Sequence, residues 1–375
     1  MISTSLPTLG LATGDMSVSE SITTWALRGG YARFNYTFDD KYIAEFNGRY
    51  DGTSRFPKDS RFVFNPSGSV AWVVSREKFF KPFENIFSFF KLRYSYGVLG
   101  NQDVGAYEYI ATMGSGKTSQ IIDGEQPVYV NAPGLVSGGL TWEKVSTSNL
   151  GVEMNFLNNR LTFNGDYYVR RTKDMLTTGE PLPNVLGTPV PKENTADLKT
   201  EGWEITLGWK DRFKLGGKPF DYQLGFNLAD SRAYITKFKN TTGILSSNYE
   251  GKEIGEIWGY TTLGFFTSQE DIDNHADQSK LASYASSRPI APGDLKFADL
   301  NGDGEVYRGA NTLDDHGDLR VIGNSRARFT YGFTAGGNWN GFDLSLFLQG
   351  VGKKDYNPSG DLYFWGIYAQ PWTNI

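Results

Sequence analysis

Apolar and polar side chains alternate along much of the chain with a period of two residues. In the segment 32–38 the even positions carry Ala, Phe or Tyr, whereas the odd positions carry Arg, Asn and Thr. A period of two places the two sets on opposite faces of a β-strand. The same alternation recurs in segments 42–51, 150–156, 161–170, 203–209, 222–228 and 342–348. The pattern predicts about ten strands, most of them long enough to cross a bilayer as tilted strands of roughly ten residues.

The joints between these segments alternate in length. Short turns are expected at 39–41, 157–160 and 340–341, and longer connections at 52–61, 98–140, 174–199 and 237–327. Short joints at one end and long ones at the other indicate an up-and-down sheet whose ends face different environments. This is typical of outer-membrane barrels, which have short periplasmic turns and long extracellular loops. We therefore predict an all-β chain that forms part of an antiparallel, up-and-down transmembrane β-barrel, with 237–327 as a long extracellular loop.

A soluble β-sandwich is the alternative, because it also hides one apolar face of each strand. Three features favour the barrel. The polar face carries many charges, the joints alternate in length along the whole chain, and aromatic residues make up 15% of the sequence. Trp and Tyr gather at membrane interfaces. Aromatic residues predicted at strand ends are Tyr31, Phe38, Tyr42, Tyr50, Trp203 and Trp209.

Composition excludes several classes of protein. The chain of 375 residues has no segment typical of a linker, so 1–375 is predicted to be one barrel section without separate domains. It has no cysteine, which excludes disulfides and thiolate chemistry. A net charge of −5 without a basic cluster disfavours a nucleic-acid partner. There is no run of roughly 18 apolar residues, the length a membrane-spanning helix needs.

The N-terminal segment 1–11 lacks the charged and apolar regions of a secretory signal. An outer-membrane protein needs such a signal for export, so we expect this sequence to be a piece of a longer chain. Open sheet edges lead to the same expectation, because a membrane does not tolerate unpaired strands. The missing strands must then come from elsewhere.

Ordered blocks along nearly the whole chain resemble the SusC/RagA-like TonB-dependent outer-membrane transporters of Gram-negative bacteria. Two of them are APGDLKFADLNGDGEV at 291–306 and VIGNSRARFTYGFTAGGNWNGFDLSLFLQG at 321–350. The others lie at 30–56, 65–79, 91–109, 140–176 and 201–209. The resemblance implies a barrel of about 22 strands, of which this chain is a middle-to-late section. On this resemblance we expect the given sequence to fall outside the signal peptide, TonB box, plug domain, early strands and final strands of that family.

The resemblance also implies a function. Such transporters of the bacterial outer membrane import large nutrients, typically oligosaccharides or peptides. A SusD-like surface lipoprotein binds the substrate and acts as a lid, and TonB supplies energy by pulling on the plug. We expect no enzymatic activity. Two alternatives are a surface platform that imports nothing and a soluble β-sandwich hydrolase that uses a pair of carboxylates.

The segment DLNGDGEVY carries the one motif with metal chemistry of its own. Asp299, Asn301 and Asp303 stand at positions one, three and five of a calcium-binding loop, with Gly304 at six and the carbonyl of Glu305 at seven. Calcium takes roughly six to eight oxygen ligands, and the glycine permits the sharp turn. The pattern predicts a structural Ca²⁺ site, and a turn held by its own side-chain hydrogen bonds is the alternative.

The second half of this motif departs from the calcium-loop pattern, because position twelve is Ala310 instead of an acid. In the family that the chain resembles, an Asp follows shortly before Arg-Val-Ile-Gly. Asp318, just before 320–323, is the best match and completes the predicted ligand set. Asp314 and Asp315 are competing ligands.

Other apparent motifs are weaker. The segment 114–118, GSGKT, lacks the earlier glycine of a phosphate-binding loop and is not followed by a helix pattern. The two histidines, His275 and His316, lie in separate polar loops without a nucleophile pattern. Flat aromatic side chains in the loops are better candidates, because they stack on ligands and anchor interfaces. The predicted substrate or partner contacts are Trp258, Tyr260, Tyr356, Tyr363, Trp365 and Trp372.

Overall fold

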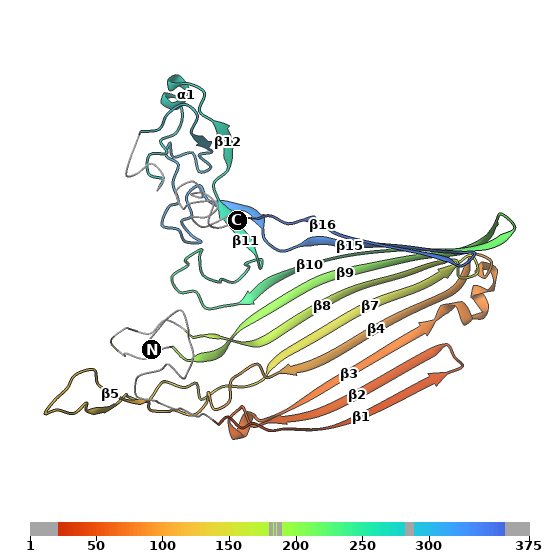
Figure 1. Ribbon diagram of the computed structural model, residues 1–375, viewed down its shortest axis with the longest axis horizontal. Helices are drawn as coiled ribbons and strands as arrows, with labels where there is room; N and C mark the ends of the chain where they lie inside the picture. The colour runs from red at the N-terminus through yellow and green to blue at the C-terminus, as the bar shows by residue number, and fades with distance from the viewer. Residues whose placement is uncertain (1–21, 180–182, 184, 186–189, 282–288, 357–375) are drawn as a thin grey trace, which may run out of the picture.

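The computed structural model describes residues 22–356 apart from 180–182, 184, 186–189 and 282–288. Over these residues the chain forms one large antiparallel sheet of ten strands (Figure 1). Every strand in it pairs with the next large strand along the chain, so the sheet is an up-and-down meander. The predicted all-β, up-and-down architecture and the number of long strands are confirmed.

The strands of the large sheet are β1 (Leu27–Phe38), β2 (Tyr42–Thr53), β3 (Phe62–Val73), β4 (Phe87–Asn101), β7 (Glu143–Phe156), β8 (Leu161–Thr178), β9 (Lys192–Leu215), β10 (Lys218–Lys237), β15 (Arg328–Trp339) and β16 (Phe342–Lys353). The connections contain β5 (Ser115–Lys117), β6 (Val128–Val130), β11 (Glu256–Gly259), β12 (Thr262–Phe265), β13 (Leu295–Phe297), β14 (Arg320–Asn324) and helix α1 (Gln269–Asp273). Three 3₁₀ turns are η2 (Lys58–Ser60), η3 (Val74–Arg76) and η4 (Lys78–Phe83).

Continuous strand pairing turns the period-two pattern into two faces. Ala44 pairs with Val70, Val70 with Tyr94, and Tyr94 with Leu150, which gives an apolar row across four strands. We call the side that carries this row the apolar face, and the opposite side, which carries Arg93, the polar face. Large side chains of the apolar face are exposed, as in Phe34 at 68%. Apolar surface of this extent needs an apolar environment to cover it.

The tight turns lie together at one end of the sheet (Figure 1, right). Two-residue turns of this kind need left-handed backbone, which Asn, Asp and Gly adopt most easily. Asn340 and Gly341 between β15 and β16 have φ of 50° and 86°, and Gly216 and Gly217 between β9 and β10 have φ of 60° and 78°. The joint between β3 and β4 is longer and contains η3 and η4.

The long connections lie at the other end of the sheet (Figure 1, left). The connection between β4 and β7 holds the β5–β6 hairpin, and the connection between β10 and β15 holds two small sheets and α1. The predicted alternation of short and long joints therefore holds except at β3–β4, where the joint 74–86 is longer than the connection 54–61 before it. No helix in the described ranges is both long and apolar enough to span a membrane.

A compact apolar cluster lies under the long connections. Phe56, Val104, Leu140 and Trp142 are buried together, and the rings of Phe56 and Trp142 are 5.3 Å apart. The indole of Trp142 donates to the carbonyl oxygen of Arg61 at 3.2 Å. The cluster joins the β2–β3 connection to the β4–β7 connection, so the loop end of the sheet has its own small core.

Two of the predicted interfacial aromatic residues lie elsewhere. Tyr31 pairs with Arg49 and so belongs to the polar face, where it is 82% exposed. Trp203 lies in the middle of β9, because this strand begins at Lys192, well before the alternating segment that the sequence shows. The prediction that these two residues lie at strand ends is wrong, although Trp203 does belong to the apolar face, since it pairs with Tyr167, the partner of Leu150. The face of the sheet on which an aromatic side chain lies can be assigned only when the register of its strand is known.

Candidate functional site

Acidic and basic side chains of the polar face pair with one another across strands. The guanidinium of Arg93 on β4 lies 2.6 Å from the carboxylate of Asp166 on β8 and 3.1 Å from that of Glu153 on β7. Lys91 is 3.3 Å from Glu153, and the amide of Asn149 donates to Asp166 at 2.7 Å. These five residues form a network across three strands, which we call the Arg93 network.

A glycine on the middle strand, β7, leaves room for the Arg93 side chain to cross that strand. Arg93 pairs with Gly151, and Gly151 pairs with Asp166. A Cβ atom at position 151 would lie 2.6 Å from both Cζ and Nε of Arg93. This is closer than non-bonded atoms approach, so Arg93 reaches Asp166 because residue 151 has no side chain.

Other charges near β1 and β2 are also paired. Arg33 lies 2.6 Å from Glu45, and Arg49 lies 2.7 Å from Asp51. Ser67, Ser69, Ser95 and Thr147 surround a shallow polar groove of about 300 Å³ between these pairs and the Arg93 network. The polar face thus combines mutually neutralised charges with small hydroxyl side chains, a surface suited to water and to polar solutes.

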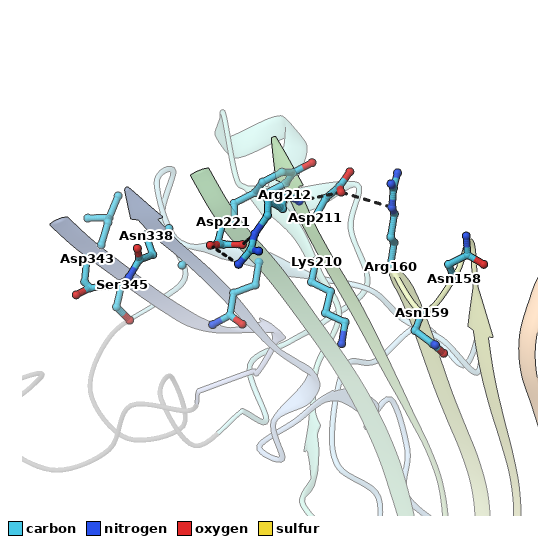
Figure 2. Close-up of a pocket in the computed structure, with 15 residues that line it drawn as sticks. Asn158, Asn159, Arg160, Lys210, Asp211, Arg212, Asp221, Asn338, Asp343 and Ser345 are labelled. Carbon is cyan, nitrogen blue, oxygen red and sulfur yellow. Dashed lines mark hydrogen bonds and ion pairs between the residues drawn. The ribbon is translucent and has the colours of Figure 1, made fainter. Parts of the chain in front are cut away.

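A larger hollow of about 540 Å³ lies at the tight-turn end (Figure 2). Its polar-face floor is one row of paired residues, in which Lys210 pairs with Gln223, Gln223 with Gly336, and Gly336 with Ser345. Because these residues come from four strands, sequence reasoning missed the hollow. The only signal that could have found it is the register of those strands.

Two ion pairs border this hollow in Figure 2. Arg212 donates to both carboxylate oxygens of Asp221, at 2.5 and 3.0 Å. Arg160, in the turn before β8, lies 3.4 Å from Asp211. A bidentate guanidinium–carboxylate pair fixes the orientation of both groups. The hollow is therefore a polar depression with a well-defined rim.

Two of the predicted aromatic contacts lie within the long loop. The indole of Trp258 donates to Glu256 at 2.8 Å, and its ring lies 5.6 Å from that of His316. Tyr260 lies 5.5 Å from the ring of Phe297. Both side chains are half-buried and pack inside the loop. Their contact with a substrate or partner stays a prediction.

The remaining predicted aromatic contacts lie near the C-terminal end of the sequence. Tyr356 is 76% exposed, at the loop end of β16. Tyr363, Trp365 and Trp372 lie outside the described residues. Their roles stay predictions.

A buried tyrosine anchors the base of the long loop. Tyr249 is 7% exposed, and its hydroxyl donates to Glu256 and accepts from the indole of Trp258 at 3.2 Å. Burial, together with the hydrogen bond to Glu256, raises the pKa of Tyr249 from 10.0 to about 12. Both effects favour the neutral phenol over the phenolate. The loop therefore depends on a phenol that stays protonated.

The predicted calcium segment forms a turn held by its own side chains. The carboxylate of Asp299 accepts from the backbone N–H of Gly302 at 2.6 Å and of Gly304 at 2.9 Å. Asn301 donates to Asp303 at 2.8 Å. Gly302 and Gly304 have φ of 76° and 85°, which explains why both are glycine. This arrangement is an Asx-type turn.

Asp318, the last predicted calcium ligand, is fully buried beside this turn. Its carboxylate accepts from the backbone N–H of Leu300 at 2.6 Å and of Tyr307 at 3.0 Å. Glu305 pairs instead with Lys280. In the described ranges no group of three or more His, Cys, Asp or Glu side chains is placed to hold a metal ion. The oxygens are engaged with protein donors here, and calcium binding stays a prediction.

The two histidines pack against neighbouring side chains, and the glycine-rich segment lies in a loop hairpin. His275 contacts the carbonyl oxygen of Phe297 at 2.7 Å and packs on the edge of Phe266 at 5.3 Å. The ring of His316 is tilted against that of Trp258, far along the chain from His275. The glycine-rich segment 114–118 contains the strand β5 and no helix.

Residues 3–285 match the family model described as TonB dependent receptor-like, beta-barrel. The chain belongs to this family of TonB-dependent receptor barrels. TonB-dependent receptor P3 of Formosa agariphila is 28% identical over 89% of this chain and 32% of its own length. TonB-dependent receptor SusC of Bacteroides thetaiotaomicron is 27% identical over 85% of this chain and 30% of its own length. The chain thus spans about a third of the curated relatives it matches.

Solved structures of the RagAB peptide importer have the same fold. Its 'closed-closed' state matches with a TM-score of 0.69 and 22% identity, over 93% of this chain and 36% of that chain. The expected resemblance to SusC/RagA-like receptors is confirmed, and the named relatives are receptors, not enzymes. In the TonB-dependent receptor barrel the apolar face is the lipid-facing wall and the polar face lines the interior. Proteins of this family reside in the outer membrane.

We predict that Gly151→Ala destabilises the receptor by about 1–2 kcal/mol, because the new methyl group displaces Arg93 from a partly exposed charged hydrogen bond with Asp166. Thermal unfolding of the full-length receptor in detergent measures the loss. Gly30→Ala is the matched control, since this strand glycine has no heavy atom within 4 Å of an added Cβ. Equal melting of both variants contradicts the bridging role of Arg93.

We predict that Asp318→Ala loosens the turn at 299–307, because backbone N–H groups that are now satisfied lose their acceptor at a cost of about 1–3 kcal/mol. Hydrogen exchange of Leu300 and Tyr307 is expected to accelerate at least about tenfold. Asp314→Ala serves as the control, since Asp314 is exposed and makes no hydrogen bond or ion pair within the described residues. Unchanged protection in Asp318→Ala refutes the capping role.

We predict that the long loop loses stability in alkali. A raised folded-state pKa means that Tyr249 stabilises the loop fully below the unfolded value of 10.0 and loses this contribution as the pH rises toward about 12. Limited proteolysis of the loop between pH 9 and pH 12 measures the effect, with Tyr249→Phe as reference. Because Phe cannot ionise, proteolysis of this variant should lack that part of the pH dependence. If the proteolysis rates of wild type and Tyr249→Phe rise in parallel between pH 9 and pH 12, the prediction is wrong.

Proposed function

We propose that this chain supplies part of the barrel wall and a large extracellular loop of a transporter in the bacterial outer membrane. The transporter imports large polar nutrients, oligosaccharides or peptides, with energy from TonB and with a SusD-like surface lipoprotein as partner. The single observation that carries the proposal is the meander with one apolar and one charge-paired polar face, in a chain that belongs to the TonB-dependent receptor barrels. Such a wall separates lipid from a polar interior.

The chemistry of the polar face supports a large polar cargo. Its charges are largely neutralised within the wall, as in the Arg93 network and the Arg33–Glu45 pair. A wall of this kind does not trap ions of one sign, and its Ser, Thr and Asn side chains exchange hydrogen bonds with a passing solute. The structural relative is called a peptide importer, and SusC is a relative in sequence. Both cargo classes therefore stay within the proposal.

The long loop supports the partner in this proposal. It carries two small sheets and α1 beyond the ends of the barrel strands (Figure 1). Side-chain capping by Asp318 and the Tyr249 cluster give it a fixed shape. A surface that is already ordered is suited to bind a lipoprotein lid, because few further side chains lose conformational entropy on binding.

We predict that the full-length receptor, purified from its native outer membrane in mild detergent, carries a surface lipoprotein in stoichiometric amount. Quantitative mass spectrometry of the complex measures the ratio and identifies retained oligosaccharide or peptide. Uptake of that compound should stop when TonB is deleted. A receptor that emerges alone and empty instead indicates a surface platform.

A further inference from the structure

One tyrosine of the polar face lies flat against the sheet. Tyr168 on β8 pairs with Gly202 on β9. A Cβ atom at position 202 would lie 2.5 Å from both Cζ and Oη of Tyr168. The ring therefore occupies the space that a side chain at position 202 would fill. One side of the ring covers the backbone, and the other side is turned toward the barrel interior.

The same packing also occurs on the lipid-facing wall. Tyr331 on β15 covers Gly350 on β16, again with Cζ and Oη 2.5 Å from the position of an added Cβ. Covering a glycine with an aromatic ring supports sheet packing on either face. The packing alone thus says nothing about binding, but Tyr331 offers a matched control for Tyr168.

The surroundings distinguish Tyr168 from Tyr331. The guanidinium carbon of Arg170 lies 5.8 Å from the centroid of the Tyr168 ring. On the neighbouring strand, Glu204 lies two residues from Gly202 on the same face, at the side of the ring away from Arg170. Neither Arg170 nor Glu204 forms an ion pair within the described part of the chain. They differ in this from the charges of the Arg93 network.

An amide oxygen beside the ring also lacks a donor. Asn149 on β7 pairs with Tyr168, and its Nδ2 donates to Asp166. Its Oδ1 is buried and receives no hydrogen bond from the described residues. A buried acceptor without a donor is costly. Because this oxygen has almost no accessible surface, a ligand hydroxyl group reaches it only after the amide turns toward the barrel interior.

We propose that Tyr168, Arg170, Glu204 and Asn149 form a subsite for a neutral sugar ring on the inner wall. A sugar ring has an apolar C–H face and a rim of hydroxyl groups. The C–H face packs on the aromatic ring. The rim accepts from the guanidinium of Arg170 and donates to Glu204 and Asn149. The flanking charges are opposite, so the subsite has no net charge and selects neutral cargo. This inference rests on the proposed import function and narrows its cargo to oligosaccharides.

The test measures binding to the full-length receptor in detergent with its co-purified lipoprotein. The probes are neutral linear oligosaccharides of α-glucan, β-glucan, xylan and mannan, and a tryptic casein digest as the peptide probe. Tyr168→Leu still covers Gly202 but removes the flat ring. We expect a loss of affinity for the retained oligosaccharide of about three- to tenfold. Tyr168→Phe should recover most of it, and Tyr331→Leu, with the same packing change on the lipid face, should stay at the wild-type value.

Each outcome decides the proposal. Loss in Tyr168→Leu with rescue in Tyr168→Phe supports the subsite. If Tyr168→Leu binds the retained oligosaccharide as tightly as wild type does, the subsite is refuted and the import function stands. The same holds if the wild-type receptor retains only peptides. If the wild-type receptor retains neither oligosaccharides nor peptides, both the proposed import function and the subsite are refuted. If Tyr168→Leu does not fold, Arg170→Gln replaces it, and undiminished sugar affinity in that variant refutes the subsite.

Discussion

Backbone hydrogen bonding between successive strands is the constraint on which the rest of this structure depends. In a lipid environment each strand must satisfy its N–H and C=O groups through its neighbours. The register accordingly runs across the sheet, and between its described strands it shifts only toward the strand ends, at Phe87–Phe89, Thr172–Leu176 and Ile235–Lys237. The pairing of Ala44 with Val70 and of Tyr94 with Leu150 shows this continuity. Once the register is set, a period of two assigns every side chain either to lipid or to the interior.

The polar interior follows from the same register. Charges that face a barrel interior are costly unless they are hydrated or paired, and the strands bring partners of opposite sign together, as in Arg93 and Asp166. Gly151 is part of this solution, because the pair is separated by a whole strand. The wall thus gains order without acquiring a net charge. Arg170 and Glu204 form no such ion pair within the described residues, so their charged groups are available to a ligand.

The loop end follows a different principle. Its segments lie beyond the barrel strands, so they cannot rely on a long sheet to satisfy their backbone. They use side-chain caps instead, with Asp299 and Asp318 accepting from backbone N–H groups. Buried rings such as Tyr249 and Trp142 supply small local cores. A loop built in this way keeps a fixed shape at the surface while the barrel carries the membrane contact.

The sequence by itself determined the fold class, the short turns at 39–41, 157–160 and 340–341 and the family, because alternation and turn residues are local signals. It misplaced Tyr31 and Trp203, since the face and depth of a residue depend on where its strand begins and with whom it pairs. Only the tertiary structure joined Lys210 to Ser345 in one row and placed Tyr168 on Gly202. Such neighbours are distant along the chain or separated by a long loop, and no local pattern encodes their register.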